Sequence, residues 1–280
     1  MTGEKQSTSR KARNDNAPPP PSRTLLADLL MGLRFYSRLP TGSSPHESPT
    51  LNRMAPALPF VSVIIGLVPA LILSICTLAG APPLFAAGLA IAASALVTGA
   101  MAEDAIADAA DGLFGGRTPE RRLEILKDSR HGTFGVTALV LFILLRVAGF
   151  GAIAESNAYA AGAFWLGITL LARSGALWLP YRLGPARTDG AAAAAGQINL
   201  VNLSAGAGFA VLIGLLLIGP FTSFLTYLIT LCVLAAITYG WTRLCKQLVG
   251  GQTGDLIGAL QALLEIAALS TLMLRAGAVF

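Results

Sequence analysis

Glu103-Asp-Ala-Ile-Ala-Asp-Ala-Ala-Asp-Gly112 follows the apolar run Leu84 to Met101 after a single alanine. This junction decides the fold, because it places an acidic segment where a membrane helix would leave the bilayer. At about 100° per residue, a helix carries Asp104, Asp108 and Asp111 within roughly 60° of one another on one face. Like charges so close repel unless they share a cation. Oxygen ligands of this kind suit Mg²⁺ or Mn²⁺, which leave positions open for substrate phosphates.

The rest of the chain is unusually apolar. Of its 280 residues, 54% are apolar and 12% charged, and the mean hydropathy is +0.65. These values lie outside the range of ordinary soluble domains. They predict an all-α fold, a polytopic transmembrane helix bundle of about seven spans with cytoplasmic catalytic loops, each span near the length of a bilayer core. The expected spans are Ala57 to Ala79, Leu84 to Met101, Thr133 to Ala154, Tyr159 to Pro180, Leu203 to Gly219, Phe221 to Leu244 and Leu256 to Leu274.

The basic residues fall in alternate connections between these spans. The connections around Ala81-Pro-Pro83, Glu155-Ser-Asn157 and Gly219-Pro220 contain no Lys or Arg. The positive-inside rule therefore places the N-terminus and the acidic segment in the cytoplasm and the C-terminus outside. The net charge of +5 follows from this bias, so no nucleic-acid partner is expected.

The N-terminal part divides into two pieces. Residues 1–23 are polar and proline-rich, which is typical of a disordered cytoplasmic tail. Residues 24–280 are expected to form a single membrane-embedded catalytic domain. Within it, Leu25 to Tyr36 has leucines at helical spacing, which indicates either an amphipathic helix on the membrane surface or a short core helix.

The candidate metal ligands are Asp104, Asp108 and Asp111, with Glu103 as a weaker fourth. Glu103 points about 100° away from Asp104 on a helix, so it is the more natural outer-shell acid. A solvated acidic helix end is the alternative for the whole segment. The two histidines, His46 and His131, are far apart in sequence, and we do not expect a histidine-based metal site.

The connection Arg117 to Gly135 is interpreted as a substrate platform. Arginine offers bidentate contacts to phosphate oxygens and lysine a point charge, although each alone is more often a topology determinant. Asp128 either completes the metal shell or pairs with Arg130. Gly250-Gly-Gln-Thr-Gly-Asp255 lets backbone approach an anion closely, but it is not a P-loop fingerprint. The candidate phosphate-binding residues of the platform are Arg117, Arg121, Arg122, Lys127 and Arg130.

Three ionisable residues lie deep inside expected spans: Arg146, Arg173 and Glu265. Such residues normally face the interior of a bundle and have a partner. From their depth, we predict that Arg146 pairs with Glu265.

Several motifs together resemble one family. They are Asp104-Ala-Ile-Ala-Asp108-Ala-Ala-Asp111-Gly112-Leu-Phe-Gly-Gly116, Arg122-Leu-Glu-Ile-Leu-Lys-Asp128-Ser-Arg-His-Gly-Thr-Phe-Gly135, Gly250-Gly-Gln-Thr-Gly-Asp255, Arg38-Leu-Pro40 and Pro185-Ala-Arg-Thr-Asp-Gly190. The chain resembles cobalamin synthase, the adenosylcobinamide-GDP ribazoletransferase (CobS) family. The matching blocks run from about Phe35 to Glu265, and two of them are long and specific.

The resemblance implies a multi-pass enzyme of the cell inner membrane that requires Mg²⁺. Family members join adenosylcobinamide-GDP to α-ribazole, or to α-ribazole 5'-phosphate, and release GMP, in the final assembly step of adenosylcobalamin (vitamin B12). The partners implied are these substrates and the lipid bilayer, with the chain working as a homo-oligomer or in a complex with other corrinoid-pathway enzymes. Catalytic residues carried over are Asp104, Asp108, Asp111 and Asp128. The matching substrate-binding residues are Arg38, Arg187, Gly251, Gln252, Thr253 and Asp255.

The chain departs from the family pattern at three positions. The family usually has His two residues before the first Asp and Gly directly after it, whereas this chain has Ala102 and Ala105. Ala262 replaces a common Glu. Loss of the His removes a candidate general base or outer-shell group, while the predicted metal ligands are unchanged.

Two other kinds of protein set aspartates at membrane helices. Intramembrane prenyltransferases and CDP-alcohol phosphotransferases also bind Mg²⁺ and a diphosphate, but neither full pattern is present here. A cation transporter would place its acids near the bilayer midplane, not at the end of a span.

Overall fold

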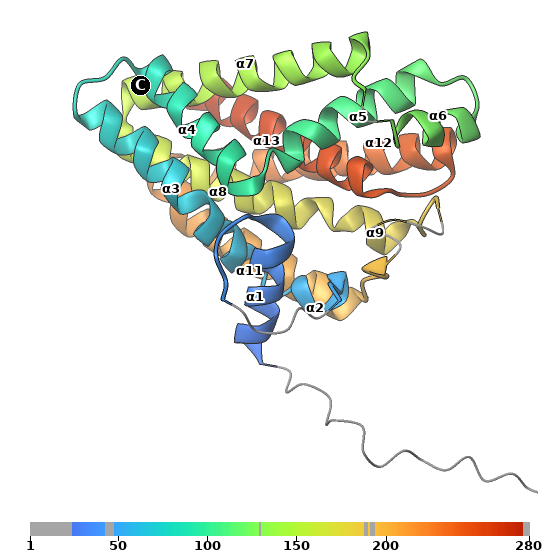
Figure 1. Ribbon diagram of the computed structural model, residues 1–280. Coiled ribbons are helices and arrows are strands. Elements are labelled where there is room, and N and C mark those ends of the chain that lie inside the picture. Colours follow the sequence, from blue (N-terminus) through green and yellow to red (C-terminus); the bar gives the residue numbers. More distant parts are fainter. Residues whose placement is uncertain (1–23, 43–47, 129, 188–189, 191–193, 277–280) are drawn as a thin grey trace, which may run out of the picture.

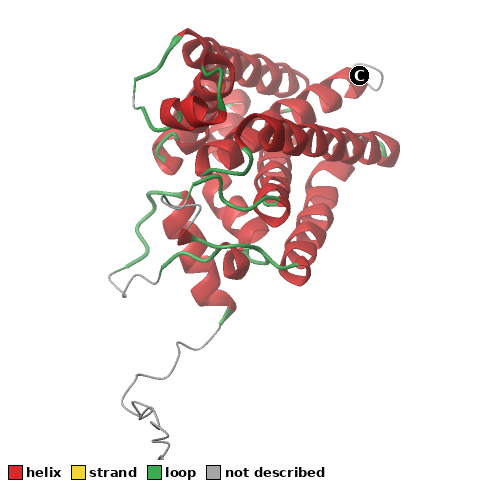
Figure 2. Cartoon of the chain, turned by 90° about the vertical axis from the view of Figure 1, so that its right-hand side faces the viewer, coloured by secondary structure: helices red, strands yellow, loops and turns green. Residues whose placement is uncertain are grey.

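A computed structural model describes residues 24–42, 48–128, 130–187, 190 and 194–276, and this part of the chain is helical (Figure 1). Figure 2 shows the same helices from the side, with no strand among the described residues, so the all-α prediction is confirmed. The helices are α1 (Leu25–Tyr36), α2 (Leu51–Met54), α3 (Leu58–Leu78), α4 (Pro83–Thr98), α5 (Met101–Gly115), α6 (Pro119–Ile125), α7 (Thr133–Ser156), α8 (Ala158–Ala176), α9 (Trp178–Arg182), α11 (Leu200–Ile218), the 3-10 turn η1 (Gly219–Phe221), α12 (Phe224–Val249) and α13 (Gly254–Ala276).

The number of candidate spans agrees with the prediction of about seven. Six helices of the described chain are long and apolar enough to cross a membrane, and the bent pair Pro83–Thr98 and Met101–Gly115 would raise the number to seven only if it formed one span. Helix α3 continues through Pro69 without a break, because a membrane helix tolerates a proline whose neighbours supply the missing contacts. Pro220 instead separates α11 from α12 within η1. The chain is therefore a multi-pass membrane protein.

The second span differs from its prediction. Helix α4 ends at Thr98, and α5 leaves it at an angle of 87°. Gly99 and Ala100 both adopt left-handed backbone angles, with φ of 70° and 58°, which ends one helix and redirects the next. A side chain at Gly99 would collide with the Arg38 guanidinium, which packs on the bend. The acidic segment is thus a separate helix and not a straight extension of the span.

Helix α8 lies at the centre of the bundle. Most of its residues are buried, and it packs against α3, α11 and α13, whereas α3, α7, α11 and α12 expose most of their apolar surface. Trp165 and Phe150 fill the core where α7 meets α8. The predicted fourth span, Tyr159 to Pro180, lies within the candidate span Ala158–Arg182, in which only Leu177 separates α8 from α9. Exposed apolar helices around one buried helix are the arrangement expected when lipid is the solvent.

Helix α1 has the bounds that its leucine spacing predicts. Its second half is buried in a small core formed with α2 and α3, through Met31, Leu33 and Tyr36. Its first residues, Leu25 and Leu26, are exposed. The helix therefore combines a core-facing end with an apolar exposed end. The predicted tail, residues 1–23, lies outside the described residues.

Candidate active site

Asp104, Asp108 and His131 form the most concentrated set of ligand groups on the described chain. Each offers one ligand atom, and these atoms lie within 4.8 Å of one another. His131 Nδ1 is 3.6 Å from Asp108 Oδ1. The two aspartates are one turn apart on α5, whereas the histidine comes from the loop that precedes α7. The structure brings two of the three predicted aspartates of α5 together with His131, a histidine that the sequence did not place beside them.

Within this group, the Asp108 carboxylate has a raised pKa. We treat α5 as lying outside the spanning segments, because four carboxylates in 15 residues make it a poor membrane helix. Burial raises the pKa of Asp108 from 3.8 to about 6. The nearby negative charges of Asp104 and Asp255 add to this rise, whereas the His131 imidazole opposes it. Negative charge is therefore concentrated beyond what the protein itself compensates, as expected of a cation site.

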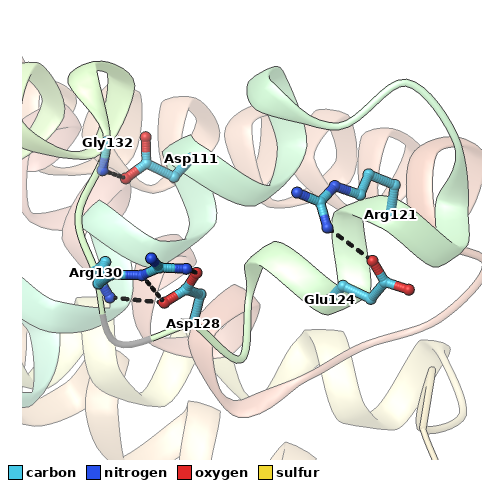
Figure 3. Close-up of polar contacts among 6 residues, drawn as sticks. All are labelled: Asp111, Arg121, Glu124, Asp128, Arg130 and Gly132. Carbon is cyan, nitrogen blue, oxygen red and sulfur yellow. Dashed lines mark hydrogen bonds and ion pairs between the residues drawn. The ribbon is translucent and has the colours of Figure 1, made fainter.

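Asp111 has a different role from its two neighbours. Its Oδ2 accepts a hydrogen bond of 2.6 Å from the Gly132 N–H (Figure 3). Its Oδ1 accepts one of 2.8 Å from the Gly135 N–H. It therefore caps the N-terminus of α7, where free N–H groups and the helix dipole attract an anion. Side chains at Gly132 and Gly135 would collide with the carboxylate. Both oxygens are already held by the protein, and Asp111 is absent from the set that approaches His131.

Glu103 points into the bundle, away from Asp104. Its Oε1 accepts a hydrogen bond of 2.9 Å from Arg146 Nη1, and both residues are buried. Arg146 Nε lies 3.3 Å from Glu265 Oε2, which confirms the predicted pair. The structure adds Glu103 as a second partner, which sequence reasoning assigned to the metal shell. A buried arginine between two carboxylates is a structural ion network, so Glu103 is not brought to the metal candidates.

Asp128 pairs with Arg130. Its Oδ2 accepts a hydrogen bond of 2.7 Å from Arg130 Nη2, and its Oδ1 accepts one of 3.0 Å from Nε (Figure 3). These bonds lower the pKa of Asp128 to about 2. Of the two roles that the sequence left open, the structure favours the ion pair over a place in the metal shell. Arg130 is largely exposed, so its guanidinium lies at the surface of the loop.

The other basic residues of the platform are spread along α6. Arg121 forms an exposed ion pair with Glu124 at 2.9 Å (Figure 3). Arg122 instead donates to the carbonyl oxygens of Leu113 and Leu248, both at 3.1 Å, and so ties α6 to the ends of α5 and α12. Arg117 and Lys127 are exposed at the two ends of the connection. The platform thus contains one structural arginine and four basic groups at its surface.

The glycine-rich segment is held against a second predicted segment. The Gln252 N–H donates to the Gly184 carbonyl at 3.0 Å, and the Ala186 N–H donates to the Gln252 carbonyl at 2.8 Å. A Cβ at Gly251 would lie 2.7 Å from the Gly184 oxygen, so only glycine fits there. Gln252 and Thr253 are buried. This pairing positions the following aspartate, because it fixes the chain directly before α13.

Asp255 and Arg187 extend the acidic group toward the glycine-rich segment. Arg187 Nη2 is 3.6 Å from Asp255 Oδ2. Among the described residues, Arg187 Nη1 is buried and has no hydrogen-bond partner, and Gln252 Oε1 is in the same position. Buried polar atoms without partners are uncommon in folded proteins and often face a ligand. Arg38 lies apart from this pair, on the bend between α4 and α5.

The three positions that depart from the family pattern lie in different surroundings. Ala105 is buried against Gly258 of α13, where a Cβ on the glycine would lie 2.5 Å from the alanine Cβ. Ala102 lines a small polar pocket beside Glu103, Arg146 and Arg173, and Ala262 is buried. Position 102 therefore faces the buried ion network. A histidine there would contact that network.

The fold and these side chains define a class: a multi-pass membrane protein that gathers carboxylates, an imidazole and arginines where α5, α13 and their flanking loops meet. A family model described as CobS, cobalamin-5-phosphate synthase, matches residues 28–273. The chain belongs to the CobS family, and the resemblance read from its motifs is confirmed.

Individual relatives agree with this assignment. The chain is 43% identical over 257 residues to the adenosylcobinamide-GDP ribazoletransferase of Azorhizobium caulinodans, which covers 90% of this chain and 97% of the relative. Relatives of the same name from Bradyrhizobium diazoefficiens and Rhizobium johnstonii are 39% identical over 252 residues and 36% identical over 248 residues. These matches cover 87% and 88% of this chain, and 92% and 95% of the relatives. No solved structure matches the chain.

Proposed function

We propose that this chain joins adenosylcobinamide-GDP to α-ribazole or its 5'-phosphate and releases GMP, as the final step of cobalamin assembly. Family membership and the names of the relatives support the activity and make the chain a transferase, against the prenyltransferase, CDP-alcohol phosphotransferase and transporter alternatives. We place the reaction centre at Asp104, Asp108 and His131, because their ligand atoms lie within 4.8 Å of one another.

The donor atoms at this centre fit a hard divalent cation. Two carboxylates supply the oxygen ligands that Mg²⁺ prefers, and the excess negative charge around Asp108 is what a dication relieves. Asp104 and Asp108 are the proposed ligands, and Asp111 supports them by fixing α7 and its loop. Mg²⁺ held there would neutralise diphosphate charge during transfer.

The transfer itself needs a nucleophile, a leaving group and a place for one proton. A ribose hydroxyl that is free in both α-ribazole and its 5'-phosphate attacks the phosphorus attached to the cobinamide, a new O–P bond forms, and the bridging P–O bond to GMP breaks. His131 lies beside Asp108 and is the side chain we assign to receive the hydroxyl proton. Arg187, with one buried N–H group unpaired, is assigned to the diphosphate, together with Arg130 at the loop surface.

The remaining predictions belong to the same proposal. The basic residues in alternate connections support a cytoplasmic reaction centre and N-terminus in the cell inner membrane. Residues 24–280 act as one catalytic domain. Assembly as a homo-oligomer, or with other corrinoid-pathway enzymes, is part of the proposal and is measurable by the mass of the purified particle.

The proposal is tested in membranes that contain the protein. Adenosylcobinamide-GDP, α-ribazole and Mg²⁺ are added, and GMP and the complete corrinoid are measured. Asp108→Asn should lower turnover by about 10³-fold, since a metal ligand contributes several kcal/mol to transition-state stabilisation. The matched control is Glu155→Gln, an exposed carboxylate at the opposite end of α7. Unchanged turnover in Asp108→Asn at saturating and limiting Mg²⁺ would remove this carboxylate from the reaction centre.

A further inference from the structure

A separate groove runs between α11 and α12, remote from the acidic group. Its volume is about 340 Å³, and its walls come from α8, α9, α11, α12 and one residue of α13. The walls are almost entirely apolar, and Ala207, Ala210 and Ala235 are among the small side chains that line them. None of the candidate metal or substrate residues lines it. The groove is therefore unexplained by the transfer reaction.

We call the end of the groove near η1 the closed end, and the opposite end, at Trp178 and Tyr239, the open end. Tyr227 of α12 donates a hydrogen bond of 2.6 Å to the Val211 carbonyl of α11, so the two helices are tied together near η1. Away from this tie they diverge, and each packs on a different neighbour, α11 on α8 and α12 on α13. The lining residues Leu200 and Val211 are 11 residues apart on α11, which is about 16 Å of helix. That length is close to half of a bilayer core of about 30 Å.

The open end carries two aromatic residues with an arginine beside each. Arg182 lies 5.8 Å from the ring centre of Trp178, and Arg243 lies 5.2 Å from that of Tyr239. Both rings line the groove, and both arginines are exposed. Within the described chain, neither arginine has a carboxylate at ion-pair distance. Aromatic and basic residues at the mouth of an apolar groove are typical of the level where lipid headgroups lie.

We propose that this groove binds an anionic glycerophospholipid. One acyl chain lies between α11 and α12 against the small side chains that line the groove, and the phosphate contacts Arg182 and Arg243 at the open end. Three features fit this occupant: the groove has the depth of one leaflet, its walls are apolar, and its mouth has uncompensated positive charge. A second protein copy would need a broad surface, whereas this concavity is narrow and blocked at one end.

The test uses the full chain, purified in detergent and exposed to an equal mixture of phosphatidylglycerol and phosphatidylcholine. Native mass spectrometry then counts the phospholipids retained by each protein. Ala235→Trp fills the groove from an exposed position, so it is expected to fold while losing the retained lipid. Ala236→Trp makes the same exchange at the next exposed residue, outside the groove, and should retain the lipid.

The headgroup part has its own variant. Arg182→Gln combined with Arg243→Gln should keep a bound phospholipid but lose the preference for phosphatidylglycerol, by roughly 25-fold if each arginine contributes about 1 kcal/mol. Equal lipid retention in Ala235→Trp and Ala236→Trp would overturn the proposal. So would a dimer that Ala235→Trp dissociates, since a second copy would then be the occupant.

Discussion

Glu103 and Asp104 are adjacent on α5, yet they belong to two regions with opposite electrostatics. Glu103 is buried with Arg146 and Glu265, and each charge there has a partner of opposite sign. Asp104 is exposed beside Asp108 and His131, where negative charges face each other. Charges buried in a bundle must be paired to fold, whereas unpaired charges at its edge weaken the fold and suit a bound cation. One helix thus supplies a structural acid and a functional acid in succession.

The buried network should show the largest effect on stability. Arg146→Met removes the arginine that pairs with both buried carboxylates and leaves only the more distant Arg173 near them, which is expected to cost about 3–5 kcal/mol of unfolding free energy. Thermal unfolding in detergent measures it, with Arg121→Met of the exposed pair as the control near zero. Neutralising all three, in Glu103→Gln, Arg146→Met and Glu265→Gln, should recover only part of the loss, because the buried Arg173 then has no carboxylate near it.

The network also changes the expected result of a charge swap. Exchanging Arg146 and Glu265 alone would place a new glutamate opposite Glu103, so the swap should not restore stability fully. Full restoration by that double variant would show that Glu103 contributes little. Glu103 would then not differ from Asp104 by a structural role in the buried network.

Asp111 lies between the two regions and should show a smaller effect. Asp111→Ala removes both acceptors of the α7 N-terminus, and we expect a cost of about 1–2 kcal/mol. The matched control is Ser223→Ala, which removes the neutral cap of α12. The charged cap should cost more, because the helix dipole favours an anion. Equal losses in the two variants would argue against a charge effect, whereas loss of Mn²⁺ binding with no loss of stability would return Asp111 to the metal shell.

Removing the charge of Asp108 should stabilise the metal-free protein, whereas removing a charge of the buried network should destabilise it. Because the pKa of Asp108 rises from 3.8 to about 6 on folding, the folded protein binds more protons between those values, and stability falls as pH rises through them. The metal-free protein should therefore be stabilised at pH 7 by Asp108→Asn, by about 1 kcal/mol after allowance for solvent screening. The gain should shrink toward pH 4. A saturating divalent ion should stabilise only the unsubstituted protein.

The measurement is thermal unfolding of both proteins from pH 4 to pH 8, with and without Mg²⁺. Glu155→Gln, at an exposed carboxylate, should show neither the pH dependence nor the loss of the Mg²⁺ response. An Asp108→Asn protein that is less stable than the parent at pH 7 without metal would contradict the idea that the partly buried Asp108 charge destabilises the metal-free fold.

The sequence predicts the parts of this comparison that depend on hydropathy and depth. The spans follow from apolar length, and the Arg146 to Glu265 pair follows from two opposite charges at similar depth. The long motifs identify the family. The bend after α4 could not be predicted, because Ala100 adopts a left-handed angle that alanine disfavours in isolation and that packing must impose.

Helix geometry alone could not predict that Asp104 and Asp108 would lie beside His131 while Asp111 caps α7. Helical spacing places Asp104, Asp108 and Asp111 on one face, but it does not say that the start of α7 meets that face at Asp111 and that His131 meets it at Asp108. One signal was available: Gly132 precedes α7 without a side chain that can cap it, so an acceptor had to come from elsewhere.

Asp128 gives the smallest expected effect and tests the edge of the functional region. Its pair with Arg130 is exposed, so Asp128→Asn should leave the unfolding temperature unchanged. Since the pKa of Asp128 is lowered to about 2, its charge is constant at all pH values above about 4, and any pH dependence there must come from other groups. A Mn²⁺ titration of the metal-binding affinity should match the parent protein, whereas Asp108→Asn should bind weakly. If Asp128→Asn lost Mn²⁺ as strongly as Asp108→Asn, the loop before α7 would supply a carboxylate ligand, and the metal site would extend beyond α5.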